Sequence, residues 1–205
     1  KRPLKICNMK KSIYTISSFI FFIIGTSFVS PTTKSMLPKH NEKPVNIADT
    51  FPVPPQKPGM LFYVQRTHNT NTIVYELNYA KDSTLNETEP IKIYWIRYAD
   101  DGSIKELSYI QRKYAYGLTS FCIDNQKKTF KVNFVSYKKR DIYLIKTNTG
   151  KKYRACMNIN NKPAYIDKIF AKIDGGTFWL PHITYVEIFG KDVNNNKPVS
   201  EKIIP

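Results

Sequence analysis

From residue 60 onward, apolar and polar side chains alternate along much of the chain, and this alternation limits the fold more than any other feature of the sequence. Segment 72–79 is the clearest example. One of its faces carries Ile73, Tyr75, Leu77 and Tyr79, and the other carries Thr72, Glu76 and Asn78. Because successive side chains of a strand point to opposite faces of a sheet, this pattern predicts a strand that is buried on one face.

Similar segments follow at short intervals, separated by turns rich in Asn, Lys and Gly. We expect strands at 61–66, 91–99, 118–124, 130–137, 142–147, 153–159, 165–173 and 183–189. Segment 91–99 is apolar on both faces, which favours a central strand. The 14 Tyr and 12 Phe also favour strands, because large flat side chains suit a pleated surface. The sequence therefore predicts a mainly β fold, α+β at the margin: a single antiparallel β-sandwich or barrel-like domain.

Alternation fails between residues 104 and 116, where apolar residues recur at helical spacing. The recurring residues are Leu107, Ile110 and Tyr114. Ser103 and Glu106 have the spacing of a capping box, and Gly117 stands where a left-handed residue commonly ends a helix. We therefore expect one short helix near 103–116.

The amino-terminal region has the pattern of a secretory signal: residues 1–11 are basic, 13–29 carry no charge, and 25–27 are small. We expect residues 1–30 to be a signal peptide. The alternative is an uncleaved inner-membrane anchor, since an apolar run of 17 residues is at the lower limit for crossing a bilayer. Both alternatives predict export, to the periplasm or the cell exterior, with membrane contact only through this segment.

The distribution of proline and of alternation divides the rest of the chain. Seven of the thirteen prolines lie in 31–59, which predicts an extended linker or an unstructured leader. The strand pattern then indicates a β-rich domain over 60–192, and 193–205 is expected to be a carboxy-terminal tail.

The formal net charge is +16, which favours polyanionic partners, although the scattered lysines are also typical of an ordinary solvated surface. Export makes nucleic acid an unexpected partner. Only Cys122 and Cys156 follow the apolar segment. In an oxidising compartment they are candidates for a disulfide, which the sequence leaves open, and their spacing predicts no metal site.

Cationic and aromatic residues occur together in three places: a turn near residue 68, the strand 91–99 and one face of the expected helix. The candidate ligand-binding residues are Arg66, Asn69, Asn71, Trp95, Arg97, Tyr109, Arg112, Lys113 and Tyr116. Such residues stack on rings and bind anions, but ion pairs and solvated faces use them as well. The expected partners are an anionic glycan, a lipid headgroup or an envelope protein.

Acidic and histidine residues support a second interpretation, a hydrolase acting on cell-envelope or polysaccharide substrates. Its candidate residues are His68, Asp100, Asp101, Glu106, Asp174 and His182. The sequence contains no nucleophile elbow, phosphate-binding loop, dinucleotide fingerprint or zinc-protease motif. It therefore favours an exported, envelope-associated binding domain without a cofactor over an enzyme. A third interpretation is a structural or assembly component whose exposed strand edges pair with a partner chain.

Four separated motifs carry a family resemblance. They are LFYVQRTHNTN at 61–71, YWIRYADDG at 94–102, LSYIQRKYAYG at 107–117 and GGTFWLP at 175–181. Over roughly residues 60–190 the chain resembles a bacterial family known as domain of unknown function 4833. The resemblance implies one exported domain, and it assigns neither an activity nor a catalytic residue.

Overall fold

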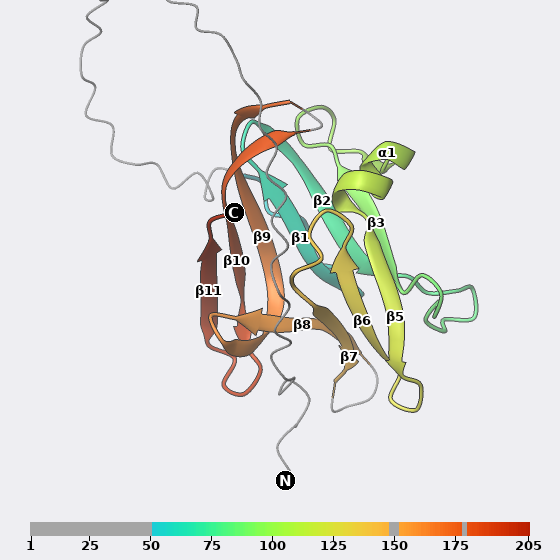
Figure 1. The fold of residues 1–205 in the computed structure, drawn as a ribbon. Helices are drawn as coiled ribbons and strands as arrows, with labels where there is room; N and C mark the ends of the chain where they lie inside the picture. The colour runs from blue at the N-terminus through green and yellow to red at the C-terminus, as the bar shows by residue number, and fades with distance from the viewer. Residues whose placement is uncertain (1–50, 148–151, 178–179) are drawn as a thin grey trace, which may run out of the picture. The chain divides into compact units, whose positions relative to one another are not determined.

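The computed structural model describes residues 51–147, 152–177 and 180–205. Within these ranges the chain forms one curled sheet of eleven strands, a half-barrel, together with a single short helical segment (Figure 1). The expected mainly β fold is confirmed. None of the described helical residues forms a helix of the length and apolar character needed to cross a bilayer. The expected signal segment lies outside the described residues and stays a prediction.

Two groups of antiparallel strands make up most of the sheet, and we call them the first and second wings. The first wing contains β1 (Met60–Arg66), β2 (Asn69–Leu77), β3 (Ile91–Ile96) and β4 (Ile104–Glu106). The second wing contains β5 (Leu118–Asp124), β6 (Thr129–Phe134), β7 (Ile142–Lys146) and β8 (Tyr153–Ile159). Within each wing, each strand pairs with its neighbour in sequence, and the connections are short turns except for the longer loop 78–90 between β2 and β3.

The long strand β9 (Lys162–Gly176) joins the two wings. Its first residues pair with β8, and its middle pairs with β1 in parallel, with Tyr63 opposite Lys168. Its other edge pairs with β10 (Pro181–Asp192), which in turn pairs with β11 (Pro198–Ile203). The sheet therefore continues past residue 192, where the expected tail begins, because β11 completes the β10 hairpin.

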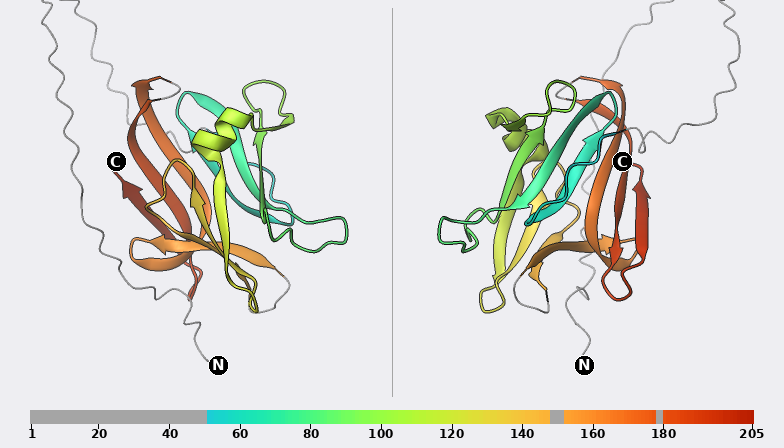
Figure 2. Two further views of the ribbon diagram at one scale, coloured as in Figure 1. Left: turned by 45° about the vertical axis from the view of Figure 1, so that its right-hand side comes forward. Right: turned by 180° about the vertical axis from the view of Figure 1, so that it is seen from behind.

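The main core lies between the inner faces of the wings and β9, which turn toward one another as the sheet curls (Figure 2). Of the four residues expected on one face of 72–79, Ile73, Tyr75 and Leu77 lie in this core, whereas Tyr79 follows β2 and is exposed. The expectation of one buried face is wrong for β2, because Thr72, Val74 and Glu76 on its other face are buried as well. Tyr75 stacks on Phe62 of β1, with 4.5 Å between the ring centroids. Across the core, Phe134 at the end of β6 meets both rings edge-on. The two wings are thus held together by interleaved aromatic and aliphatic side chains.

The outer face of the first wing is also apolar, and the residues before β1 cover it. Its buried residues are Tyr63, Val74, Tyr94 and Ile96. Residues 51–58, which we call the arm, form no strand, but Pro54 is buried and Phe51 meets Phe170 edge-on at 5.6 Å. The buried Gln65 amide donates to the Pro52 carbonyl oxygen at 2.8 Å. The last part of the expected linker is therefore packed against the domain.

A charged cluster fastens the arm to the sheet. The carboxylate of Glu76 on β2 lies 2.9 Å from the ammonium of Lys57 in the arm and 2.9 Å from that of Lys92 on β3. The Tyr94 hydroxyl donates to the same carboxylate at 2.7 Å. Burial alone would raise the pKa of Glu76, but the hydrogen bonds from Lys57, Lys92 and Tyr94 outweigh it and lower that pKa.

A second charged contact joins the carboxy-terminal strand to the second wing. Both Nη atoms of Arg140, in the β6–β7 turn, donate to the carboxylate of Glu201 on β11, with 2.8 Å from Nη1 to Oε2. Arg140 Nη1 also donates to the Asn158 carbonyl oxygen at 3.2 Å, and the Asn160 amide donates to Glu201 at 2.7 Å. We call this contact the Arg140–Glu201 clamp.

The disulfide left open by the sequence is not formed. Cys122 is an exposed free thiol on β5, whereas Cys156 is buried in β8, and two strands lie between them. Neighbouring strands are about 4.8 Å apart, so three steps across the sheet far exceed the roughly 7 Å that a disulfide allows between Cα atoms.

Candidate functional site

The predicted helix near 103–116 is wrong in its first half. Residues 104–106 form the short strand β4, which pairs with β3, and Ser103 lies in the preceding turn rather than at a helix cap. The helix α1 (Tyr109–Gln111) begins only after β4 has ended, with Ser108 as its N-cap. Its capping box is Ser108 with Gln111: each side chain bonds the backbone amide of the other, at 3.3 and 3.0 Å.

A π-helical turn, η2 (Arg112–Tyr116), continues α1, and together they lie over one end of the sheet (Figure 1). Gly117 ends the turn, but not in the left-handed conformation expected from the sequence, because its φ is −63°. It must be glycine for a different reason: a Cβ at this position would lie 1.8 Å from the Arg112 carbonyl oxygen. The wide turn also leaves the Tyr116 carbonyl oxygen available to the Tyr75 hydroxyl, which donates to it at 2.8 Å.

Three of the predicted site residues meet beneath this turn, although they come from β1, β3 and η2. The guanidinium carbon of Arg66 lies 4.9 Å from the ring centroid of Trp95 and 5.5 Å from that of Tyr116. The two rings meet edge-on, with 5.4 Å between centroids. Trp95 Nε1 donates to Gln111 Oε1 at 3.2 Å, which ties the stack to α1. We call Arg66, Trp95 and Tyr116 the Arg66 stack.

Arg66 has no acidic partner among the described residues, and its Nη1 atom is buried without a hydrogen-bond acceptor there. The side chain as a whole is half-buried. Burial raises the pKa of the Tyr116 hydroxyl, and the nearby Arg66 charge opposes that rise. A buried N–H of a cation with no acceptor is unusual, because leaving it unmet costs about 1–3 kcal/mol or more.

The outer side of the helical segment carries an exposed group of the same kind. The Lys113 ammonium lies 5.3 Å from the Tyr109 ring centroid and 5.2 Å from that of Tyr114. The two tyrosines are 72% and 56% exposed. Hydrogen bonding to Tyr109 and then Tyr114 raises the pKa of Lys113. This group offers a cation and two rings to solvent from the same helical segment that carries Tyr116.

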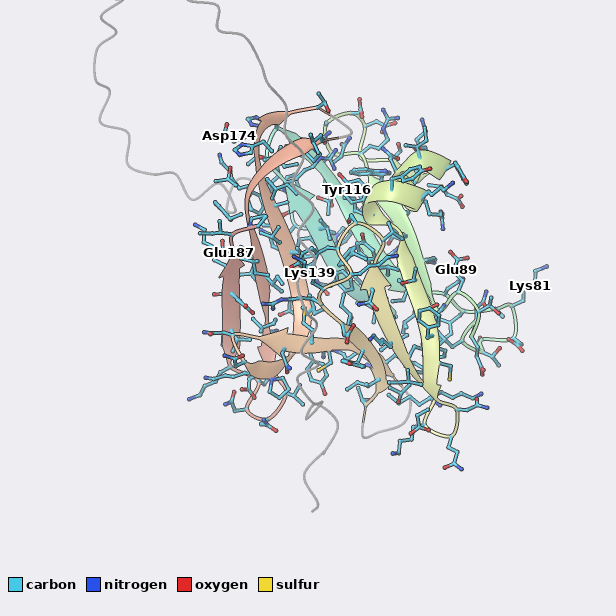
Figure 3. The ribbon with its side chains drawn as sticks, in the orientation of Figure 1. Lys81, Glu89, Tyr116, Lys139, Asp174 and Glu187 are labelled. Atoms are coloured by element: carbon cyan, nitrogen blue, oxygen red, sulfur yellow. The ribbon has the colours of Figure 1, made fainter. Side chains whose placement is uncertain are left out.

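Arg112 has a different role from that of its neighbours. Its Nη1 pairs at 3.0 Å with Glu89, which is labelled in Figure 3. Both side chains line a pocket of about 60 Å³ between β3 and β5. The pocket is lined by Glu89, Pro90, Ile91, Ile93, Arg112, Leu118, Ser120 and Val132. Ligand pockets usually hold about 300–1,000 Å³, so this one has room for little more than water.

The other predicted binding residues shape turns. Asn69 Oδ1 accepts from the Asn71 amide at 2.8 Å, and Asn71 Oδ1 accepts from the Ala99 amide at 2.8 Å. Arg97 forms an ion pair with Asp100 at 2.8 Å. The Asn71–Ala99 bond holds the start of β2 against the β3–β4 turn. Asn69 lies opposite Arg66 in the β1–β2 register, but its side-chain oxygen bonds to the Asn71 amide.

The candidate acid–base residues are placed as follows. Asp100 pairs with Arg97, and Asp101 Oδ1 accepts from the Ser103 amide at 3.0 Å, so both stabilise one turn. Glu106 is exposed on β4, and His68 occupies a left-handed turn position with φ of 62°. His182 Nδ1 lies 3.1 Å from the Asp174 carbonyl oxygen near the end of β9 (Figure 3). In the part of the chain that the structure describes, no three His, Cys, Asp or Glu residues are grouped to hold a metal ion.

Sequence reasoning missed Gln111, which both caps α1 and holds the Trp95 indole. Ser108 and Gln111 have the Ser-x-x-Gln spacing of a capping box, so the signal was present. Ser103 and Glu106 have the same spacing five residues earlier, so the sequence offered two possible capping boxes.

Comparison with known proteins gives one match. No curated protein and no solved structure matches the chain. The model of a family described as a domain of unknown function (DUF4833) matches residues 62–202, from β1 to β11, a range that includes all three residues of the Arg66 stack. Because this match spans more than half of the chain, the protein belongs to the DUF4833 family.

Proposed function

We propose that the protein is an exported, envelope-associated binding domain that recognises an anionic ligand at the Arg66 stack. The observation that carries the proposal is the half-buried guanidinium of Arg66, whose Nη1 has no acceptor among the described residues. Charged groups are rarely buried without a partner of opposite charge. An anion that enters beside the Tyr116 ring would supply both the missing acceptor and the missing charge.

The chemistry of the site favours carboxylate or phosphate groups. A guanidinium binds such groups through two parallel hydrogen bonds, and it does so better than an ammonium because its donors form a rigid fork. Trp95 and Tyr116 already stabilise the cation, and aromatic rings also stack on sugar rings. An acidic glycan or an anionic lipid headgroup therefore fits the Arg66 stack.

The charge of the chain and its amino-terminal pattern support the cellular setting of this proposal. The net charge of +16 attracts acidic polymers and surfaces, and the basic, apolar and small segments at 1–30 are typical of exported proteins. The sheet contributes no comparable support for hydrolysis, since Asp100 and Asp101 are engaged in a turn.

The test is a titration that follows Trp95 fluorescence. Trp95 and Trp179 are the two tryptophans of the chain, so the Trp179→Phe background isolates the signal of the stack. Oligogalacturonate is compared with neutral galactose oligomers, and phosphatidylglycerol vesicles with phosphatidylcholine vesicles. We expect saturable binding of one acidic probe, and we expect Arg66→Gln to weaken it at least tenfold, about 1.4 kcal/mol.

Arg154→Gln is the matched control. Arg154 also lies over an aromatic ring, Tyr165, at 4.3 Å, but on a different strand, so its replacement removes the same charge and a similar contact. It should change affinity less than twofold. Equal losses in both variants would mean that net charge alone attracts the probe, and the proposal would then be abandoned. Failure of every acidic probe to bind has the same consequence.

A further inference from the structure

Large apolar side chains that remain in solvent gather on the helical segment formed by α1 and η2. Tyr109 and Tyr114 are largely exposed, and Ile110 is 41% exposed. Because residues four apart on a helix lie one above the other, Tyr109 shares a side with Lys113, and Ile110 shares a side with Tyr114. The Lys113 ammonium lies within 5.3 Å of both tyrosine ring centroids, which joins the two pairs. We call these four residues the Tyr109 patch.

The other side of the same segment is fixed to the fold. Gln111 Oε1 accepts from Trp95 Nε1 at 3.2 Å, and Ser136 Oγ in the β6–β7 turn donates to the Ala115 carbonyl oxygen at 2.6 Å. These contacts hold the Tyr109 patch outward, and the segment stands out from the end of the sheet (Figure 2). Clustered apolar side chains that a fold holds in solvent mark a surface for interaction.

Two lysines give this surface a positive charge. Within the described ranges, neither Lys105 nor Lys113 forms an ion pair with a carboxylate. Lys105 is exposed and lies opposite Trp95 in the β3–β4 register, on the face of the sheet that α1 contacts. The neighbouring acid, Glu106, lies opposite Tyr94 on the other face. The rings and Ile110 are therefore accompanied by cations whose charge no described acid neutralises.

We propose that the Tyr109 patch docks the domain on an anionic lipid bilayer. The two tyrosines and Ile110 enter the headgroup region, and Lys105 and Lys113 contact the lipid phosphates. Tyrosine and lysine suit a membrane–water interface because each has an apolar body and a polar end, and lysines are attracted to an anionic leaflet. The sequence predicted membrane contact only through residues 1–30, so this surface would add a second contact, made by the folded domain.

A bilayer fits this surface better than an acidic glycan does. Ligand sites for small polar molecules are concave and fix their ligand with precisely placed polar groups. The Tyr109 patch is instead the outer side of a helix, and Ile110 adds an aliphatic surface beside its rings. A bilayer requires no fixed geometry, because apolar side chains enter the acyl boundary while ammonium and hydroxyl groups stay among the headgroups.

The first test measures co-sedimentation with phosphatidylcholine vesicles prepared with and without phosphatidylglycerol. The parent chain should bind only the vesicles that contain phosphatidylglycerol, and less at high salt because salt screens the attraction. Tyr109→Ala should weaken this binding about fivefold, which corresponds to about 1 kcal/mol. Phe121→Ala is the matched control, since it removes a ring that is 63% exposed on β5, and it should weaken binding less than twofold. Both variants should melt within a few degrees of the parent. Equal binding to both kinds of vesicle, or equal losses in both variants, would overturn the proposal.

Lys113→Gln and Lys202→Gln test the charge of the patch. Lys202 also lies over a tyrosine ring, that of Tyr185 at 3.7 Å, but on β11, so both variants remove the same charge and a similar contact. Lys113→Gln should weaken binding to phosphatidylglycerol vesicles about fivefold, and Lys202→Gln less than twofold. Equal losses would mean that net charge alone holds the chain on the vesicles, and the docking surface would then be wrong.

Tyr109→Trp tests entry into the bilayer directly. After subtraction of the parent's emission, the fluorescence of the new tryptophan should shift to the blue on phosphatidylglycerol vesicles. Lipids brominated on their acyl chains should quench it, and the absence of quenching would contradict the proposal. Quenching should persist when Arg66→Gln is added, because the Tyr109 patch meets the bilayer without the Arg66 stack. If Arg66→Gln abolishes the quenching, the stack makes the membrane contact and this inference fails, while the proposed function stands. Weaker binding of oligogalacturonate rather than of vesicles in Tyr109→Ala would assign the patch to a glycan and would also overturn it.

Discussion

Arg66 and Arg140 are both partly buried arginines that join distant segments of one sheet, but they differ in how their N–H groups are used. Arg140 donates to the Glu201 carboxylate through both Nη atoms and to the Asn158 carbonyl oxygen. Arg66 lies against two aromatic rings, and its buried Nη1 has no acceptor among the described residues. The charge of Arg140 is neutralised by Glu201, whereas no carboxylate in the described part of the chain neutralises that of Arg66.

The difference separates two uses of a cation. A guanidinium with all its partners supplied by the chain contributes to stability and has nothing left to offer a ligand. A guanidinium that is oriented by aromatic rings and lacks an anion is organised to bind a ligand, and it lowers the stability of the fold to some extent. Substitutions at the two sites should therefore act on different measurements, and four predictions test this contrast.

The largest effect is expected from Gly117→Ala, which tests whether the π-helical turn holds the Arg66 stack in place. The new Cβ would lie 1.8 Å from the Arg112 carbonyl oxygen, so the turn must shift and Tyr116 with it. We expect a loss of about 2–3 kcal/mol in the free energy of unfolding, measured in urea. Trp95 fluorescence should change in the folded state, while the Arg140–Glu201 clamp stays intact. Parent-like stability would show that the turn tolerates a side chain there.

Removal of the clamp should come next in size. Arg140→Ala leaves the Glu201 carboxylate, whose side chain is only 22% exposed, without its cation. We expect a loss of about 1–2 kcal/mol, because charge-assisted hydrogen bonds of partly exposed groups contribute in this range. Binding of acidic probes should be unchanged. In a double-mutant cycle with Glu201→Gln, the two losses should not add; additive losses would contradict a direct coupling.

Arg66→Met should have a smaller effect on stability, in contrast to its effect on binding. Methionine keeps most of the packing against Trp95 and Tyr116 and removes the N–H that has no acceptor. The free energy of unfolding should change by less than about 1 kcal/mol in either direction. A loss of unfolding free energy comparable to that of Arg140→Ala would mean that groups within the fold already pair with the Arg66 guanidinium. The two arginines would then not differ in how their N–H groups are paired.

The smallest effect is expected in acid. Hydrogen bonds from Arg140 hold the pKa of Glu201 below its ordinary value of 4.5. A carboxyl group with a lowered folded-state pKa stabilises the fold above that ordinary value, and the contribution disappears as the pH falls through the folded pKa. Glu201→Gln should therefore reduce the drop in melting temperature between pH 6 and pH 3, by the equivalent of less than about 1 kcal/mol. Arg66→Met should leave that drop as it is in the parent, since none of the described carboxylates pairs with Arg66.

Alternation predicted many of the strands because they bury at least one face, although β1, β2 and β3 are buried on both faces and β4 on neither. It missed β11, since the proline and charges that protect an edge strand also make it resemble a tail. It also could not give the parallel pairing of β1 with β9, which joins residues about a hundred positions apart. At residues 104–106 the strand is fully exposed, so alternation had no buried face to reveal, and a chance capping-box spacing suggested a helix.

The Arg66 stack was predictable residue by residue but not as a unit. Arg66, Trp95 and Tyr116 were each recognised as cationic or aromatic residues in places suited to binding. Their meeting depends on the order of β1, β2 and β3 and on the π-helical turn, which the sequence does not show. The missing acceptor of Arg66 depends on side-chain burial, which only the structure reveals.

The arm has a practical consequence for anyone who trims this chain for expression. The family match starts at residue 62, after Pro54 and Lys57, and stops at 202, before Ile203, which packs against the core. A fragment cut at those boundaries would lose one of the two ammonium groups that hold Glu76. It would also uncover the apolar strip around Val74 and Tyr94, a surface prone to aggregation. Expression boundaries should instead begin before Phe51 and extend to Pro205.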